Sequence, residues 1–358
     1  MLLIGLAGLA VAEHEREQLA APQVSGVVLF SRNFQSRRQL QDLVDDLRNL
    51  RGDDAFVICV DQEGGVVQRF RDGFTRLPAL AKLGQVWDRD PERAVALAEE
   101  HAWLMASELR AVDVDLSFAP VLDLARGNRA IGTRALHADP EAVSELGQAY
   151  VRGMHLAGMA AVIKHFPGHG SVATDTHKAA AIDPRPLERI LSDDLLPFAE
   201  CIEARVEAVM MAHVTYPAVD TQPAGYSRVW IERILRGELG FTGVVVSDDI
   251  SMAAAGAAGS VGGRVQAHLD AGCDLVLACF PDVVDEAIAA VRRRETDRTS
   301  LATLRGAIAA GWEGLIDNPQ RDRFVARITA LHAGPGIGNR RSETRAAPTI
   351  PDFHGDNS

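Results

Sequence analysis

The chain has 358 residues, a formal net charge of −12 at pH 7, 47% hydrophobic residues and 24% charged residues. This length can bury a large core and suits either one large α/β barrel or two ordinary domains of a globular enzyme. The acidic balance argues against a nucleic-acid partner, because phosphate binding needs a clustered basic surface and the sequence has none.

The first nine residues are apolar but differ from a signal peptide. They lack a basic start, and Glu13, Glu15 and Glu17 follow at once. No run of about eighteen apolar residues is present that could span a membrane. We therefore expect a cytoplasmic protein without a membrane partner. The cysteines have no CxxC spacing and lie in apolar surroundings, which is typical of buried reduced thiols; they are Cys59, Cys201, Cys273 and Cys279.

Short apolar runs rich in Val, Ile and Leu alternate with longer helical patterns along the chain. The runs are continuous rather than alternating, which indicates strands buried on both faces of a parallel sheet. The predicted strands cover residues 2–7, 26–30, 56–61, 112–119, 160–164, 208–212, 244–248 and 275–279.

Two helix starts between these strands are clear. Asp90 and Asp139 each precede a proline, which places an N-cap carboxylate before a proline at the first helical position. Eight strands with interleaved helices predict a single-domain (β/α)8 TIM-type barrel, which we assign to residues 1–333. Residues 334–358 are rich in Gly, Pro, Arg and Ser and are predicted to form a mobile tail.

Polar residues follow five of the predicted strands at their carboxyl ends. In a barrel of this kind, that rim carries the active site. Taken singly, each residue could be a helix cap or a surface ion pair, but five strands that bring polar groups to one rim indicate a site. The residues are Asp61, Asp123 with the 131–134 turn, Lys164 with the loop after it, His213 and Asp248 with Asp249.

The loop after the fifth strand is the most polar of these segments. It reads Lys164-His165-Phe166-Pro167-Gly168-His169-Gly170, and Asp175-Thr176-His177 follows shortly after. A carboxylate beside an imidazole holds its tautomer and raises its basicity, which suits acid/base work near neutral pH. Such a pair also occurs by chance on surfaces.

Asp248 directly follows an apolar run and is predicted to lie in the barrel mouth, where its carboxylate could attack a substrate carbon. The alternative is that Asp248 caps the next helix while Asp249 faces water. His165 and His169 raise the possibility of a metal site. The first strand, however, offers no ligand, whereas a barrel metallohydrolase usually places a His-x-His pair there.

Together these motifs resemble the glycoside hydrolase family 3 β-N-acetylglucosaminidases, of the single-domain bacterial type that recycles cell wall. The resemblance runs from the first strand to about residue 330. It is carried by the motifs Gly26-Val27-Val28-Leu29-Phe30-Ser31-Arg32-Asn33, Asp61-Gln62-Glu63-Gly64-Gly65, Phe118-Ala119-Pro120-Val121-Leu122-Asp123, the Lys164 loop with its Asp175-Thr176-His177 ending, and Ser247-Asp248-Asp249-Ile250-Ser251-Met252. Thr176 stands where serine is more usual.

The resemblance implies a retaining mechanism on a β-linked N-acetylglucosamine. Asp248 would be the nucleophile, and His177, oriented by Asp175, would be the acid/base. The sugar-binding positions of the family fall on Asp61, Arg69, Arg134, Lys164 and His165. The implied substrate is a muropeptide with N-acetylglucosamine on 1,6-anhydro-N-acetylmuramic acid. No cofactor, metal or obligatory protein partner is implied.

Three alternatives stay open on the sequence alone. A phosphorylase of the same family would pass the glycosyl group to phosphate instead of water, and a histidine acid/base tolerates an anionic acceptor. A metal-dependent amidohydrolase would act on the muropeptide. A non-catalytic sugar-binding protein would hydrolyse no glycoside at all.

Overall fold

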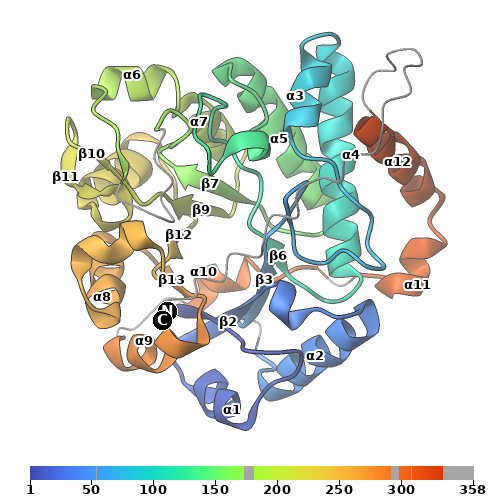
Figure 1. Cartoon of the computed structure of the whole chain (residues 1–358), viewed down its shortest axis with the longest axis horizontal. Coiled ribbons are helices and arrows are strands. Elements are labelled where there is room, and N and C mark those ends of the chain that lie inside the picture. The colour runs from blue at the N-terminus through green and yellow to red at the C-terminus, as the bar shows by residue number, and fades with distance from the viewer. Residues whose placement is uncertain (54, 173–180, 292–297, 308, 334–358) are drawn as a thin grey trace, which may run out of the picture.

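The computed structural model describes residues 1–53, 55–172, 181–291, 298–307 and 309–333. Figure 1 shows strands in the middle of the molecule and most helices around them. Eight strands form one sheet, and each neighbouring pair in it is parallel. In spatial order they are β6 (Leu116–Ser117), β3 (Val57–Val60), β2 (Val24–Leu29), β1 (Leu2–Gly5), β13 (Leu275–Ala278), β12 (Val244–Asp249), β9 (Ala208–Met211) and β7 (Val162–Phe166).

The two end strands, β6 and β7, close this sheet into a barrel. Val121, shortly after β6, forms a parallel bridge with Lys164 of β7. The amide of Val162 donates to the carbonyl oxygen of Ala119 at 3.0 Å, and the amide of Lys164 donates to that of Pro120 at 3.2 Å. The predicted single-domain (β/α)8 barrel is therefore confirmed.

Helices surround the barrel, and two of their predicted starts can be checked directly. The side chains of Asp90 and Asp139 accept hydrogen bonds from the amides of Arg93 and Glu141, both at 3.1 Å, as N-caps do. The helices are α1 (Glu13–Ala20), α2 (Arg37–Leu50), α3 (Ala81–Trp87), α4 (Pro91–Arg110), α5 (Pro140–Leu156), α6 (Leu187–Ser192), α7 (Leu196–Glu203), α8 (Val261–Ala271), α9 (Val284–Ala290), α10 (Arg298–Ala302), α11 (Gly311–Ile316), α12 (Pro319–Thr329) and the π-helix Val229–Glu238.

Short elements inserted after the barrel strands complete the mouth. An antiparallel pair follows β3, and a small three-stranded sheet lies on the side of β7 and β9. The pair is β4 (Gln62–Gly64) with β5 (Val67–Gln68), and the sheet is β8 (Ala181–Ile182), β10 (Val214–Tyr216) and β11 (Asp220–Pro223).

All eight predicted strands are present, but the fourth is much shorter than predicted. Residues 112–115 were expected in it, yet the strand covers only Leu116–Ser117. The amides of Val112 and Val114 both bond to the carbonyl oxygen of Leu109 at 3.1 Å, and Asp113 has a φ of 56°. The apolar residues at 112 and 114 thus complete the carboxyl end of α4 instead of extending the sheet.

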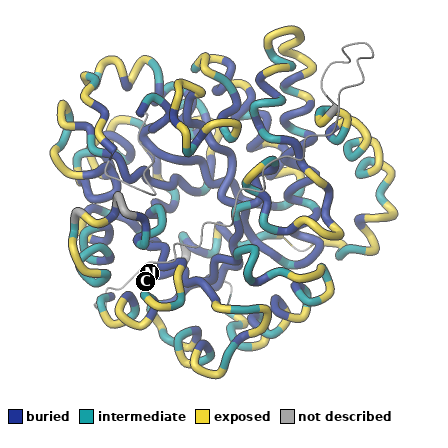
Figure 2. The backbone as a smooth tube through the Cα atoms, viewed as in Figure 1, coloured by how far each residue is buried: buried dark blue, intermediate teal, exposed yellow. Residues whose placement is uncertain are grey.

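Both faces of the barrel strands pack against apolar side chains. In β3, Val57 and Cys59 belong to the cluster inside the barrel, whereas Ile58 and Val60 pack in the layer under the helices. This explains why the runs are continuously apolar in sequence. Figure 2 shows the buried residues concentrated in the middle and the exposed ones on the outer turns.

The four cysteines are buried and free, as predicted. Among the helices of the described ranges, none is both long and apolar enough to cross a bilayer.

Gly5, at the end of β1, allows the close approach of β13. A Cβ at this position would lie 1.9 Å from the carbonyl oxygen of Cys279 and 2.8 Å from Nη2 of Arg32. We expect Gly5→Ala to lower the free energy of unfolding by about 3 kcal/mol, because backbone atoms must move to admit the methyl group. Thermal or urea unfolding measures the change.

Gly8→Ala is the matched control, since a Cβ at Gly8 would meet nothing within 4 Å. It should leave stability within about 1 kcal/mol of the wild type. Equal stability of the two variants would contradict the close packing of β1 against β13.

Candidate active site

The centre of the barrel mouth is a buried lysine with two carboxylates. Lys164 lies on β7, and its side chain is 2% exposed. Its Nζ lies 2.8 Å from Oδ1 of Asp61, which follows β3, and 2.6 Å from Oε1 of Glu63 on β4. A buried ammonium is stable only with such partners. The contacts therefore connect β7 to the segment after β3, the strand that lies beyond β6 in the closed barrel.

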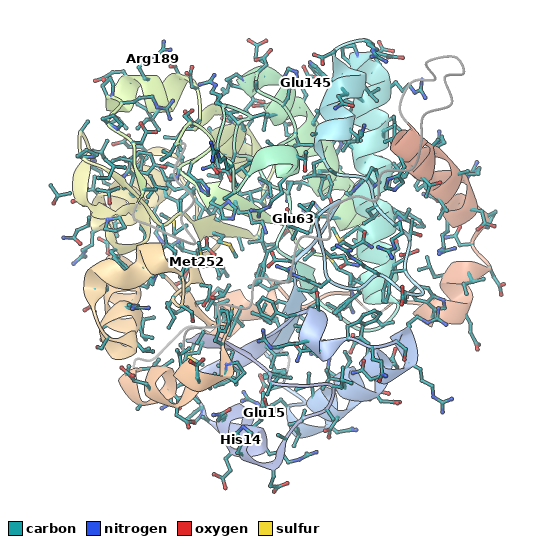
Figure 3. The ribbon with its side chains drawn as sticks, in the orientation of Figure 1. His14, Glu15, Glu63, Glu145, Arg189 and Met252 are labelled. Atoms are coloured by element: carbon teal, nitrogen blue, oxygen red, sulfur yellow. The ribbon has the colours of Figure 1, made fainter. Side chains whose placement is uncertain are left out.

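Glu63 also holds an arginine of the mouth. Nε and Nη2 of Arg134, in the short helix Gly132–Arg134, donate to Oε2 and Oε1 of Glu63, both at 2.8 Å. Burial alone would raise the pKa of Glu63. The charges of Arg134 and Lys164 and their hydrogen bonds outweigh burial and lower that pKa to about 2. One ionised carboxylate thus fixes two cations, and in Figure 3 it lies towards the centre of the ring of helices.

Arg69 lies on the other side of Asp61. Its Nη2 is 4.0 Å from Oδ2 of Asp61, and its guanidinium is 5.7 Å from the ring centre of Phe30. The Nε atom is buried and has no hydrogen-bond partner in the described part of the chain. This donor of Arg69 is thus unpaired within the described residues.

His165 forms a buried pair with Asp123. Oδ2 of Asp123 accepts from Nδ1 of His165 at 2.6 Å, and Oδ1 accepts the amides of His165 and His169 at 3.4 and 2.9 Å. Burial would raise the pKa of Asp123, but the two histidines and these hydrogen bonds hold it well below its usual range. The ionised carboxylate assigns a proton to Nδ1 of His165, so Nε2 is the atom left for a ligand.

His169 shapes the loop with its backbone. Its amide donates to Asp123, and its carbonyl oxygen accepts from Nδ2 of Asn128 at 2.9 Å. Burial lowers the pKa of the His169 imidazole to about 4, so the ring is neutral at pH 7.

Asp123, His165 and His169 also bring three donor atoms within 4.8 Å of one another, close enough to bind a metal ion. Both oxygens of Asp123 already accept hydrogen bonds, and Nδ1 of His165 donates one of them. A metal ion would have to displace these bonds.

Asp248 and Asp249 end β12 at the same mouth. Oδ1 of Asp248 accepts the amide of Asp249 at 2.8 Å. Oδ1 of Asp249 accepts the amides of Ser251 at 3.1 Å and of Cys279 at 3.3 Å. Asp249, rather than Asp248, therefore caps the turn after β12 and links it to β13, and it does not simply face water.

The two neighbouring carboxylates influence each other. Burial raises the pKa of Asp249, the amide hydrogen bonds oppose this, and the nearby charge of Asp248 adds to it, so the pKa reaches about 6. His213, after β9, bonds through Nε2 to the carbonyl oxygen of Asp249 at 3.0 Å. Burial lowers the pKa of His213, so this ring is neutral and Nε2 carries its proton.

Asp175 and His177 lie outside the described residues, which stop at 172 and resume at 181. The described residues on both sides are held in place. Tyr216 donates its hydroxyl to the carbonyl oxygen of Gly168 at 2.7 Å. Arg185 pairs with Asp183 at 2.6 Å and with Asp194 at 2.7 Å.

Of the predicted sugar-binding residues, Lys164 pairs directly with Asp61 and is linked to Arg134 through Glu63, and Arg69 lies next to Asp61. His165 follows Lys164 directly on β7. Sequence reasoning placed Asp123 at the rim without a role of its own and did not single out Glu63, although both stood in the motifs. The missed signal for Glu63 was its i,i+2 spacing from Asp61 at a strand end, which puts two carboxylates close to one buried lysine.

A model of the glycosyl hydrolase family 3 N-terminal domain matches residues 2–304. The chain belongs to this family. The match confirms the resemblance drawn from the motifs and makes the protein a glycoside hydrolase.

Relatives and solved structures agree with this family. The chain is 58% identical over 316 residues to a beta-hexosaminidase of Stenotrophomonas maltophilia, with 88% of this chain and 94% of that protein covered. A beta-hexosaminidase of Xylella fastidiosa is 56% identical over 328 residues, which cover 92% and 98% of the two chains. The crystal structure of NagZ from Neisseria gonorrhoeae with N-trifluoroacetyl-D-glucosamine has a TM-score of 0.86 at 38% identity, covering 92% and 97%. NagZ of the same organism is also known in complex with a zinc ion.

The raised pKa of Asp249 predicts how the stability of the protein depends on pH. The folded protein holds this proton to about pH 6, whereas the unfolded chain releases it near 3.8. The wild type therefore loses the stabilisation that comes from holding this proton as the pH rises through 6. Relative to the wild type, Asp249→Asn should become more stable as the pH rises from 3.8 to 6. Above pH 6 the difference in the free energy of unfolding should reach about 3 kcal/mol.

Urea unfolding of both proteins at several pH values from 4 to 8 tests this. Asp42→Asn on the exposed side of α2 is the control for removing one carboxylate. A stability difference for Asp249→Asn that does not change with pH would contradict the assignment.

Proposed function

We propose that this β-N-acetylhexosaminidase of family 3 is an exo-acting, retaining enzyme. It removes terminal β-linked N-acetylglucosamine from 1,6-anhydro-muropeptides during cell-wall recycling in the cytoplasm. The supporting observation is the cluster of charged groups around Lys164 at the mouth, with the carboxylate of Asp248 on the same rim. The relatives' name and the sugar analogue bound to the gonococcal NagZ support the same substrate class.

The sugar-binding part of the proposal rests on charge-assisted hydrogen bonds. Asp61, Arg69, Arg134 and Lys164 offer ionised acceptors and donors to the hydroxyl groups of a terminal sugar, and His165 offers Nε2. The bonds of Glu63 and Asp123 hold these groups in position before the sugar arrives. Such preorganisation lowers the cost of ordering side chains on binding.

The chemical part has two steps. Asp248 attacks the anomeric carbon while His177 donates a proton to the glycosidic oxygen, which leaves with the aglycone. His177 then takes a proton from water, whose oxygen attacks the same carbon and releases Asp248. Two inversions give net retention. Asp175 orients the His177 ring, and the assignment of both residues rests on the sequence motif.

We assign this activity to residues 1–333 as the catalytic domain, without a cofactor or metal. The family phosphorylase stays as the alternative closest in chemistry, with phosphate in place of water. A metal-dependent amidohydrolase would use the Asp123, His165 and His169 group, which the existing hydrogen bonds disfavour.

A substrate panel tests the proposal. We expect p-nitrophenyl N-acetyl-β-glucosaminide to be cleaved at least about a hundredfold faster than the β-glucoside, because a site built to hydrogen-bond a substrate group rejects an analogue that lacks it. Inorganic phosphate should neither speed turnover nor yield a sugar 1-phosphate. A chelator should leave the rate unchanged. Sugar 1-phosphate formation would establish the phosphorylase. Loss of activity with the chelator would contradict the metal-free mechanism and support the amidohydrolase.

His177→Ala separates the acid role from sugar binding. The p-nitrophenolate leaving group needs little protonation, whereas a sugar alkoxide needs it, and general acid catalysis contributes roughly 10²- to 10⁴-fold. We expect kcat/KM, which reports the first step alone, to fall much more for a disaccharide substrate than for the p-nitrophenyl glycoside. An equal loss on both substrates would remove His177 as the acid.

A further inference from the structure

Asp248 lies in a β-bulge of β12. Val246 pairs with Leu275 of β13, and the next pair joins Asp249 to Leu277. Three steps along β12 therefore match two steps along β13, so β12 carries one extra residue between these pairs. An extra residue bends the strand and redirects a side chain, and bulges of this kind occur next to active sites. The bulge therefore determines where the carboxylate of the predicted nucleophile points.

A bulge leaves backbone groups without their usual partners in the sheet, and here two side chains bond to them. Ser247 donates its hydroxyl to the carbonyl oxygen of Asp248 at 2.7 Å and accepts the amide of Leu277 at 3.0 Å. Nε2 of His213 lies 3.0 Å from the carbonyl oxygen of Asp249. A carbonyl oxygen only accepts hydrogen bonds, so Nε2 donates. One side chain of β12 and one from outside the strand thus hold the bulge.

His213 reaches the bulge from the neighbouring strand. It lies two residues beyond the end of β9, and β9 and β12 run side by side in the sheet (Figure 1). The last pair between the two strands is Val246 with Met210. Beyond that pair the bond from His213 to the carbonyl oxygen of Asp249 continues the connection. A side chain thus replaces the ladder of backbone bonds where the bulge interrupts it.

Within the described ranges, this bond is the only hydrogen bond of the His213 imidazole. Its Nδ1 is buried and unpaired there. The ring packs against Tyr226 and His268, whose ring centres are 6.3 and 5.4 Å away. Burial lowers the pKa of His213 against the opposing charge of Asp248, so the ring is neutral at pH 7. A buried, unpaired nitrogen destabilises the fold relative to an apolar side chain, so the bond to Asp249 is the contribution that a leucine could not make.

We propose that His213 is a positioning residue for the nucleophile, because its Nε2–H bond to the carbonyl oxygen of Asp249 holds the bulge that points Asp248 at the anomeric carbon. The inference rests on the proposed function, in which Asp248 attacks that carbon. Attack needs aligned reacting atoms about 3–3.5 Å apart, and a shift of about 1 Å can lower the rate about a hundredfold. Lys164 of the sugar-binding set is held by separate ion pairs, so sugar binding does not require this bond.

His213→Gln and His213→Asn test the bond directly. The terminal amide nitrogen of glutamine reaches the approximate position of Nε2, whereas that of asparagine stops near Nδ1 and cannot reach Asp249. We expect kcat/KM for p-nitrophenyl N-acetyl-β-glucosaminide to fall about a hundredfold in His213→Asn and less than about tenfold in His213→Gln. The inhibition constant of N-acetylglucosamine, which measures sugar binding without attack, should stay within about threefold of the wild-type value in both.

The leaving group distinguishes this role from a disturbed acid. A displaced nucleophile slows the first step for every leaving group, so His213→Asn should lose kcat/KM about equally on the p-nitrophenyl glycoside and on a disaccharide. A much larger loss on the disaccharide would assign the effect to proton donation and overturn the proposal. Equal activity of the two His213 variants, or a parallel weakening of N-acetylglucosamine binding, would overturn it as well.

His268→Leu is the matched control. His268 is a buried histidine of α8, and its Nδ1 bonds to the carbonyl oxygen of Gly225 at 2.8 Å. The variant loses a buried imidazole–carbonyl bond outside the bulge, so Tm should fall as in His213→Asn while kcat/KM stays within about threefold of the wild type. A loss of kcat/KM as large as that of His213→Asn would show that any damage to this part of the core slows the reaction, which contradicts a specific role of His213.

Ser247→Ala decides the point if His213→Asn fails to fold, since it removes the other side-chain bond of the bulge. It should lower kcat/KM about tenfold or more and leave N-acetylglucosamine binding unchanged. Wild-type kcat/KM in Ser247→Ala would mean that the bulge needs no such support and would overturn the inference while leaving the glycosidase intact. A wild-type protein that cleaves no N-acetylglucosaminide would contradict the proposed function itself.

Discussion

The mouth of this barrel depends on one buried ion pair, between Nζ of Lys164 and Oε1 of Glu63 at 2.6 Å. Both side chains are almost fully buried, so each charge needs partners of opposite sign. Removing one partner of such a pair typically costs about 3–5 kcal/mol, because a charge stays buried without compensation. The same carboxylate holds Arg134, and the same lysine holds Asp61. Four charged groups from three separate segments are therefore fixed by mutual attraction.

The barrel makes this arrangement possible by bringing the carboxyl ends of distant strands to one rim. β6 and β7 must meet for Lys164 to reach the loop after β3, and the Val121 bridge to Lys164 marks that closure. On the other side, Gly5 lets β13 approach β1 closely enough for Arg32 to bond to both. Closure of the barrel backbone thus brings the segments together, and the charges of the side chains then hold the site in place. The buried carboxylate of Asp123 fixes His165 in a similar way, although it holds an imidazole instead of a cation.

Most of the fold could be predicted from the sequence, because most buried strands are apolar runs and the proline-led helices α4 and α5 carry their own caps, Asp90 and Asp139. Residues 112–115 were misjudged, since the apolar side chains at 112 and 114 pack equally well at the end of α4. Site residues were predictable where a motif marks them, as for Asp61 and Lys164. Glu63 and Asp123 were not assigned, because their function is to hold other side chains and appears only when those partners are placed in space. Asp175 and His177 fall outside the described residues and remain predictions.

The central claim is that Asp248 carries the glycosyl group during turnover. A slow 5-fluoro analogue of an N-acetyl-β-glucosaminide with a good leaving group should accumulate the intermediate, which mass spectrometry of the intact protein and its peptides detects. The account predicts a mass gain of one fluorosugar on the peptide that contains Asp248, and none in Asp248→Ala. A label on another residue, or full hydrolysis by Asp248→Ala, would contradict it.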